Sequence, residues 1–130
     1  MTDVKELRLV LTVRDFDTAL AFYRDALGLE VEAVWSSENG HVTLLSAGRA
    51  TLELVDEAHA AEIDRLEVGR RVAGPVRVAF EVPDSGELAG KLEAAGATRI
   101  AGPVTTPWKD RNVRLEAPDG TQLTLFTPAE

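Results

Sequence analysis

The chain has 130 residues, no cysteine and a formal net charge of −8 at pH 7. The lack of cysteine excludes disulfides, thiol chemistry and thiolate-bound metals, and the negative charge disfavours nucleic acid as a partner. No segment approaches the roughly 18 apolar residues that cross a membrane. Residues 1–6 lack the apolar core of a signal peptide. We therefore expect a soluble, cytoplasmic protein that binds neither nucleic acid nor membranes.

The first part of the chain predicts a strand, a helix and three further strands. Apolar residues alternate over 7–13, which is typical of a strand with one apolar face. Asp15 is a suitable N-cap for a helix whose apolar residues recur at helical spacing until Gly28. Gly48 then joins the last two of three predicted strands, which lie near 29–35, 40–47 and 50–55.

The second part predicts the same order of elements. Residues 57–74 form a linker, of which 57–66 has weak helical character, and the second module begins near Pro75. A strand at 77–82 precedes Asp84, which caps a helix that Gly96 ends. Three strands follow, near 97–101, 110–116 and 121–127.

The two parts therefore form a repeat of a βαβββ module. Val13-Arg14-Asp15 and Val82-Pro83-Asp84 both close a strand and open a helix. They lie about 70 residues apart, beyond the roughly 20–50 residue period of a solenoid repeat. We predict one domain over residues 1–130, built from modules at about 1–56 and 75–130 with a linker at about 57–74. Equivalent positions should meet near a pseudo-two-fold axis.

Several short motifs, in this order and spacing, carry a resemblance to a known family. They are VRD (13–15), AFYRDALGL (21–29), VAFEV (78–82), AAG (94–96), GPV (102–104), PW (107–108) and APDG (117–120). Together they resemble the vicinal oxygen chelate superfamily, which includes glyoxalase I, the extradiol dioxygenases and the bleomycin-resistance proteins. The resemblance covers essentially the whole chain. It implies an α+β fold in which two βαβββ modules pair edge to edge and form an open, cup-shaped sheet. It also implies a homodimer, because such cups are often completed across subunits.

The resemblance implies a site inside the cup. In the family, four side chains from the first and last strand of each module often hold a divalent metal. These positions fall on Arg8, Glu53, Arg77 and Thr124. Arginine stays protonated and offers no acceptor, and threonine is a weak ligand, so only Glu53 suits a cation. A metal site built from His41 and Glu53 would need an unusual geometry. We therefore expect no metal and no other cofactor.

Strand parity predicts the residues that line the cup, because the apolar faces must pack against the helices. The cup-facing residues are Arg8, Val10, Thr12, Glu53, Val55, Arg77, Ala79, Glu81, Gln122, Thr124 and Phe126. Tight hairpin turns pair Thr43 with Glu53 and Arg114 with Thr124. This register adds His41, Thr43, Leu45, Asn112, Arg114 and Glu116. A slip of one residue would move this second set to the other face.

The charged side chains of the cup allow two interpretations. Arg8, Arg77 and Arg114 lie opposite Glu53, Glu81 and Glu116. These charges either form a paired cluster in place of a metal, with Glu53 beside Arg8, or offer arginine donors to a carboxylate, phosphate or phenolate of a ligand. The two are compatible if a ligand and Glu53 compete for one arginine.

Aromatic residues near the strand ends suggest how a ligand would be held. Trp108 with Phe126, and Trp35 as a third, are candidates for stacking on an aromatic or cationic ligand. Core or dimer packing is the alternative for these rings. His41 is a general base, a ligand-binding residue or an ordinary strand residue.

The leading hypothesis is metal-independent binding of an aromatic or drug-like molecule, similar to sequestration by the bleomycin-resistance branch, which confers antibiotic resistance. One alternative is a lyase or oxidoreductase of glyoxalase or dioxygenase type with an altered metal site. Another is a metal-free lyase or isomerase that uses Glu53 as its base. A third alternative is a dimerisation scaffold that binds no ligand.

Overall fold

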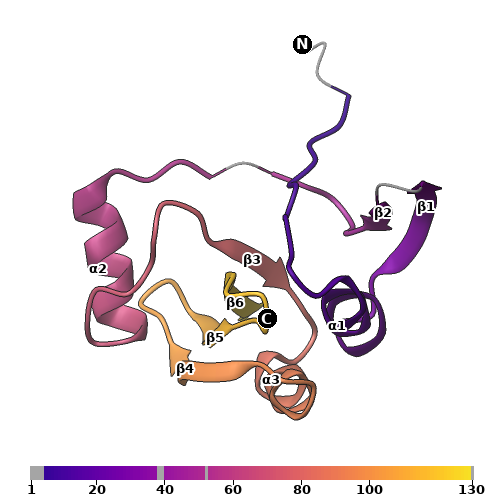
Figure 1. Ribbon diagram of the computed structural model, residues 1–130. Helices are drawn as coiled ribbons and strands as arrows, with labels where there is room; N and C mark the ends of the chain where they lie inside the picture. Colours follow the sequence, from indigo (N-terminus) through magenta and orange to yellow (C-terminus); the bar gives the residue numbers. More distant parts are fainter. Residues whose placement is uncertain (1–4, 38–39, 52, 130) are drawn as a thin grey trace. The chain divides into compact units, whose positions relative to one another are not determined.

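A computed structural model describes residues 5–37, 40–51 and 53–129 of the chain. Two compact units, Met1–Leu54 and Val55–Glu130, divide the chain. The first contains a two-stranded sheet and the second a four-stranded sheet, each accompanied by helices (Figure 1). The predicted α+β class is confirmed. Among these residues no helix combines the length and apolar character that a membrane span needs.

The first unit contains a short helix that changes pitch. Helix α1 (Phe16–Leu20) continues into a π-helical segment η1 (Ala21–Ala26). The side chain of Asp15 accepts a hydrogen bond of 3.0 Å from the backbone N–H of Thr18, which confirms the predicted N-cap. Gly28 follows η1 with a φ of +91°, a conformation that glycine adopts without steric cost. The buried residues of this segment are Ala19, Phe22 and Tyr23.

Two of the four strands predicted for the first unit are present. Strands β1 (Glu30–Ser37) and β2 (Gly40–Ser46) pair antiparallel. The predictions of strands at 7–13 and 50–55 are wrong for the described residues, which lie in no strand there. Leu52, within the second segment, lies outside the described residues. Alternation of apolar residues indicates which face of a strand is apolar. A strand also needs a neighbouring strand whose backbone pairs with its N–H and C=O groups. Thr43 accordingly pairs with Val34 of β1, and not with Glu53.

The second unit confirms the βαβββ order after an initial helix. Helix α2 (Glu57–Glu67) precedes strand β3 (Val78–Glu81) and helix α3 (Ser85–Ala94). Three strands follow: β4 (Thr98–Thr105), β5 (Asp110–Glu116) and β6 (Gln122–Pro128). The sheet order is β3-β6-β5-β4, with β3 parallel to β6 and the other neighbours antiparallel.

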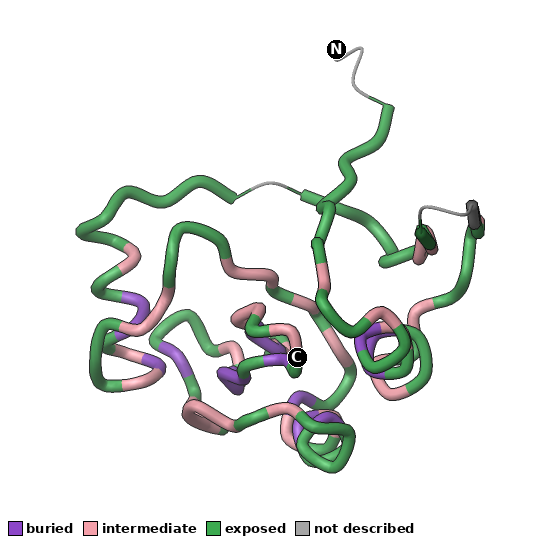
Figure 2. Tube along the Cα trace, viewed as in Figure 1, coloured by how far each residue is buried: buried purple, intermediate pink, exposed green. Residues whose placement is uncertain are grey.

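One face of this sheet forms the core of the unit (Figure 2). Helix α3 packs against β4, β5 and β6. The fully buried side chains between them are Ala89, Leu92, Val113, Leu115, Leu123 and Leu125. Each buried leucine contributes about 1.5–3 kcal/mol through the hydrophobic effect. The alternation of these residues along β5 and β6 leaves polar side chains on the opposite face.

The register of β5 and β6 fixes those polar side chains. Arg114 pairs with Thr124 and Glu116 with Gln122, which confirms the predicted register. Gly102 of β4 has a φ of +101°, and an added Cβ would lie 2.6 Å from the carbonyl oxygen of Asn112. Only glycine fits there, because the backbones of β4 and β5 approach so closely.

Candidate functional site

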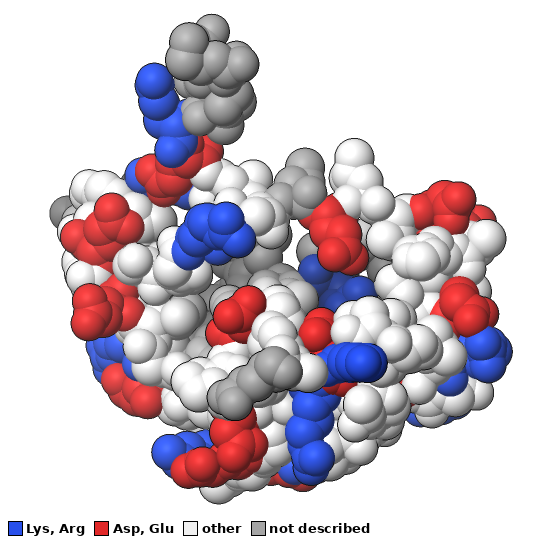
Figure 3. Space-filling view, turned by 180° about the vertical axis from the view of Figure 1, so that it is seen from behind, with Lys and Arg blue, Asp and Glu red and all other residues white. Residues whose placement is uncertain are grey.

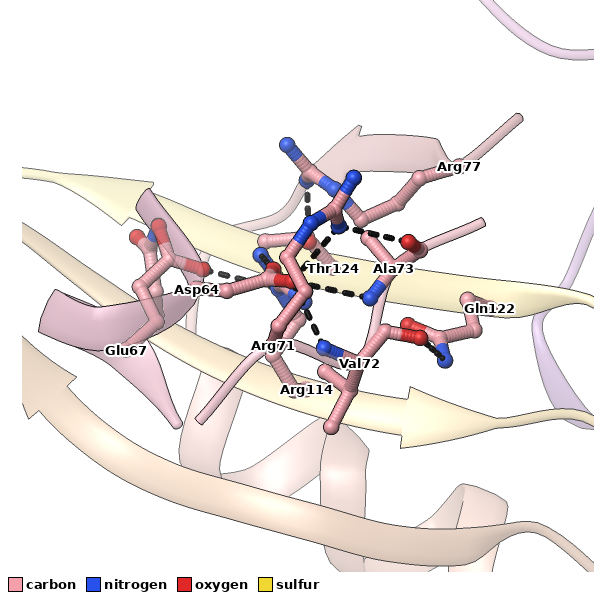
Figure 4. Close-up of polar contacts among 10 residues, drawn as sticks. Asp64, Glu67, Arg71, Val72, Ala73, Arg77, Arg114, Gln122 and Thr124 are labelled. Atoms are coloured by element: carbon pink, nitrogen blue, oxygen red, sulfur yellow. Dashed lines mark hydrogen bonds and ion pairs between the residues drawn. The ribbon is translucent and has the colours of Figure 1, made fainter. Parts of the chain in front are cut away.

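A layer of polar side chains lies between α2 and the sheet of the second unit (Figure 4). We call it the polar layer. Helix α2 contributes two carboxylates and the loop after it two arginines, and strands β5 and β6 contribute the groups that face them. Its members are Asp64, Glu67, Arg71, Arg77, Asn112, Arg114, Gln122 and Thr124.

Arg114 is the central cation of the polar layer. It is 1% exposed. Its Nε donates to Oε1 of Glu67 and its Nη2 donates to Oδ1 of Asp64, both at 2.9 Å. Removing such charges from water is costly, and only close, hydrogen-bonded partners offset the cost. The carboxylates of α2 therefore hold this guanidinium in the interior.

Asp64 connects the helix, the following loop and the sheet. Its Oδ2 accepts from Nη1 of Arg71 at 2.9 Å and from the backbone N–H groups of Val72 and Ala73 at 2.8 Å each. Burial alone would raise the pKa of Asp64. The two backbone hydrogen bonds, together with those from Arg71 and Arg114, outweigh burial and hold that pKa well below its usual range. Asp64 is therefore ionised wherever the protein is folded near neutral pH.

Several polar atoms of the layer lack a partner among the described residues. Asn112 donates from Nδ2 to Oε2 of Glu67 at 2.9 Å, and Gln122 donates from Nε2 to the carbonyl of Val72 at 2.8 Å. These bonds fix both amides. The buried atoms that make no hydrogen bond are Asn112 Oδ1, Gln122 Oε1 and Arg114 Nη1. Buried donors and acceptors are rarely left unpaired, so each of these atoms can take one further hydrogen bond.

Arg77 and Thr124 occupy the two metal-ligand positions that the resemblance places in the second unit. Nη1 of Arg77 donates to Oγ1 of Thr124. Arg77 is thus a permanent cation, and the hydroxyl oxygen of Thr124 accepts its hydrogen bond. This donor set does not fit a divalent ion, which needs several deprotonated oxygen or nitrogen ligands. No group of His, Asp or Glu suitable for a metal ion occurs among the described residues.

The first unit holds the other two positions and two more predicted site residues. Arg8 pairs with Glu6 at 2.7 Å, on an exposed segment. The expected neighbour, Glu53, is exposed and makes no ion pair in the described part of the chain. The ring of His41 lies 5.6 Å from that of Phe16. Trp35, on β1, is 52% exposed.

The aromatic pair of the second unit lies toward one end of its sheet. Trp108 belongs to the turn between β4 and β5 and is 47% exposed. Phe126 is half-buried on β6, where it pairs with Asn112 of the polar layer. An aromatic ligand near Phe126 would therefore also meet the amide of Asn112.

The sequence pattern does not predict the acidic partners of Arg114. Glu81 and Glu116, which it places among the charges of the cup, are exposed, and Asp64 and Glu67 bind Arg114 instead. Both lie in residues 57–74, which the sequence predicts as a linker. One signal was present: Asp64 and Glu67 are three positions apart and share the helix face of Ile63, where apolar residues are the rule. Carboxylates on the buried face of a helix predict a buried cation nearby, because a buried charge needs a partner of opposite sign.

Charged groups elsewhere are interspersed. On the face that Figure 3 shows, Lys and Arg lie among Asp and Glu and do not gather into areas of one sign.

Comparisons with known proteins agree with this fold. A model of the family described as Glyoxalase/Bleomycin resistance protein/Dioxygenase superfamily matches residues 7–125. A search of curated protein sequences found no match.

Solved structures resemble the chain over nearly its full length. A hypothetical protein, SA1046 from S. aureus, is 17% identical with a TM-score of 0.66, covering 97% of this chain and 95% of its own. TnmS3, an antibiotic binding protein from Streptomyces sp. CB03234, is 22% identical with a TM-score of 0.65, covering 99% and 100%. A glyoxalase/bleomycin resistance protein from the same organism is 24% identical with a TM-score of 0.54, covering 87% and 91%. At these identities the likeness shows the fold alone.

Proposed function

Because this chain belongs to the glyoxalase/bleomycin resistance protein/dioxygenase superfamily, we propose that it binds a small organic molecule without a metal ion. The proposal includes sequestration of an aromatic or drug-like ligand by a cytoplasmic homodimer. Affinity alone would perform this function, through stacking and a few charged contacts.

The hydrogen bond between Arg77 and Thr124 carries the proposal. It joins the two positions of the second unit where members of the family with a metal keep its ligands. A guanidinium at such a position repels a divalent cation and donates to acceptors instead. Buried Arg114, opposite Thr124 on the next strand, extends the same chemistry. Arginine donors at these positions suit an organic molecule with acceptor groups.

Two further observations support a drug-like ligand. One protein of this fold, TnmS3, is described as antibiotic binding. In this chain, the exposed ring of Trp108 and the half-buried ring of Phe126 offer flat apolar surfaces toward one end of the sheet. Aromatic rings and arginine donors together would hold an aromatic molecule that carries polar substituents.

Elemental analysis and ligand screening test the proposal together. Protein purified without chelators should contain no stoichiometric divalent metal by plasma mass spectrometry. A panel of aromatic antibiotics and metabolites should contain compounds that quench tryptophan fluorescence, equally with and without EDTA. A stoichiometric bound metal, or a panel in which no compound binds, would contradict the proposal.

A further inference from the structure

The hydrogen bonds of Arg114 leave one nitrogen of its buried guanidinium without a partner among the described residues. Glu67 accepts from Nε and Asp64 from Nη2, so two different carboxylates each take a single bond. Nη1 is buried and has no partner among the described residues. The strongest arrangement for a guanidinium is different, because one carboxylate then accepts two parallel bonds from one edge. Here the edge formed by Nη1 and Nη2 is only half used.

Asp64 can lose its hydrogen bond to Nη2 of Arg114 and still keep its other hydrogen bonds. Among the described residues its Oδ1 accepts only from Arg114, whereas its Oδ2 accepts from Arg71 and from the backbone N–H groups of Val72 and Ala73. Loss of the Oδ1 contact would leave three hydrogen bonds on the carboxylate. Glu67 would also keep its bonds to Nε of Arg114 and to Asn112.

From this geometry we propose that Arg114 binds the carboxylate of an organic ligand through Nη1 and Nη2, and that this carboxylate replaces Oδ1 of Asp64. The inference rests on the proposed function and names the class of its ligand. The exchange satisfies the unpaired Nη1, and Arg71 with the backbone N–H groups of Val72 and Ala73 still binds the displaced carboxylate of Asp64. Asp64 is then an internal competitor that occupies the site until the ligand arrives.

Neighbouring groups indicate what else the ligand carries. Asn112 lies two positions before Arg114 on the same face of β5, and its Oδ1 is an unpaired acceptor. It therefore suits a donor such as a hydroxyl group. Phe126 pairs with Asn112 on β6 and offers an apolar surface for a ring. The chemical class that fits is a hydroxylated aromatic carboxylate.

Three compounds that share one ring and one hydroxyl separate the roles of charge and shape. They are 4-hydroxybenzoate as the anion, 4-hydroxybenzamide as the neutral analogue and tyramine as the cation. Isothermal titration calorimetry at low salt should show binding of 4-hydroxybenzoate at least about tenfold tighter than that of the other two. Equal or tighter binding of the neutral or cationic compound overturns this inference but leaves metal-free ligand binding intact. Binding of none of the three also overturns it, while the broader panel decides the proposed function separately.

Substitutions in the protein test whether the carboxylate of the ligand binds Arg114. Arg114→Lys keeps the charge that Asp64 and Glu67 need but cannot form two parallel bonds, so 4-hydroxybenzoate should bind about tenfold more weakly. Arg111→Lys is the matched control, because Arg111 is exposed and belongs to the same strand, and it should leave the affinity unchanged. Asp64→Asn weakens the competitor and should tighten binding of the anion. An Arg114→Lys protein that binds like the wild type, or an Asp64→Asn protein with unchanged affinity, overturns the inference. The compound series on the wild-type chain tests it even where a variant does not fold.

Discussion

At the scale of single residues, the burial of Arg114 governs the chemistry of the second unit. A guanidinium that is 1% exposed is tolerable only because Asp64 and Glu67 accept from two of its nitrogens. Removing one charged side chain from such a buried cluster strongly destabilises the folded protein, because the remaining charges stay buried without a partner.

Arg114→Met should lower the free energy of unfolding by about 3–5 kcal/mol. The substitution leaves Glu67 with Asn112 alone and takes one of the four hydrogen bonds from Asp64. Urea unfolding followed by circular dichroism measures the change. Arg111→Met, at an exposed position of the same strand, is the control and should change stability by no more than about 0.5 kcal/mol. Equal effects of both substitutions would refute the structural role of Arg114.

The lowered pKa of Asp64 predicts a pH dependence of stability. The folded protein keeps this carboxylate ionised below the pKa of about 3.9 that an unfolded chain has. Around that pH the unfolded chain binds more protons, so the free energy of unfolding falls as the pH falls. The contribution is complete above about pH 5 and is lost in more acid solution.

Asp64→Asn removes this titrating group. The difference in unfolding free energy between wild type and Asp64→Asn should therefore be largest near neutral pH and shrink as the pH drops toward about 3. Urea titrations at a series of pH values measure it. Two curves that stay parallel over this range would show that Asp64 does not carry the dependence.

At the scale of elements, the helices of the second unit hold the sheet by different means. Helix α3 buries Ala89 and Leu92 against the apolar face. Helix α2 instead places carboxylates against the polar face and contributes Ile63 as its apolar contact. The stability of α3 therefore depends on ordinary helix features, whereas that of α2 depends on charge pairing.

Asp84→Ala tests the capping of α3. The side chain of Asp84 accepts from the backbone N–H of Glu87 at 3.1 Å. Its loss should cost about 1 kcal/mol in the free energy of unfolding. Asp84→Asn keeps an acceptor at the N-cap and should cost only a few tenths of that. Urea midpoints of the two variants compare them, and an Asn variant as unstable as the Ala variant would assign the loss to charge and not to capping.

At the scale of the whole molecule, the chain belongs to the glyoxalase/bleomycin resistance protein/dioxygenase superfamily. At three of the four positions where the resemblance implies metal ligands, it has Arg8, Arg77 and Thr124, whose side chains suit a divalent ion poorly. The fold does not decide function, because function resides in the side chains of the site.

We therefore expect that removal of metal ions does not change the thermal stability of the protein. Dialysis against EDTA is expected to leave the thermal unfolding midpoint unchanged, and later addition of zinc, nickel or manganese should not raise it. A ligand that binds only the folded state stabilises it in proportion to its concentration. Differential scanning calorimetry would detect this, and a midpoint that rises with added metal would contradict the prediction.

Comparison of the two units shows which parts of the fold could be predicted. In the second unit, alternation along β5 and β6 and the turn at 118–120 specified strands, faces and register, including the pairing of Arg114 with Thr124. These signals are local, since period and turn length are properties of neighbouring residues. In the first unit, the alternation over 7–13 was equally clear, yet no strand forms among the described residues there. Backbone pairing depends on a partner that the segment itself does not encode.

The sequence by itself determined the class of fold and the βαβββ order of the second unit. Periodicity, capping residues and turn residues are sufficient for these. Only the tertiary structure decided that Asp64 and Glu67 bind the buried Arg114. The reason is that an ion pair requires two groups to lie within a few ångströms, and Arg114 is 50 residues from Asp64 along the chain. Packing of α2 on the sheet brings them together.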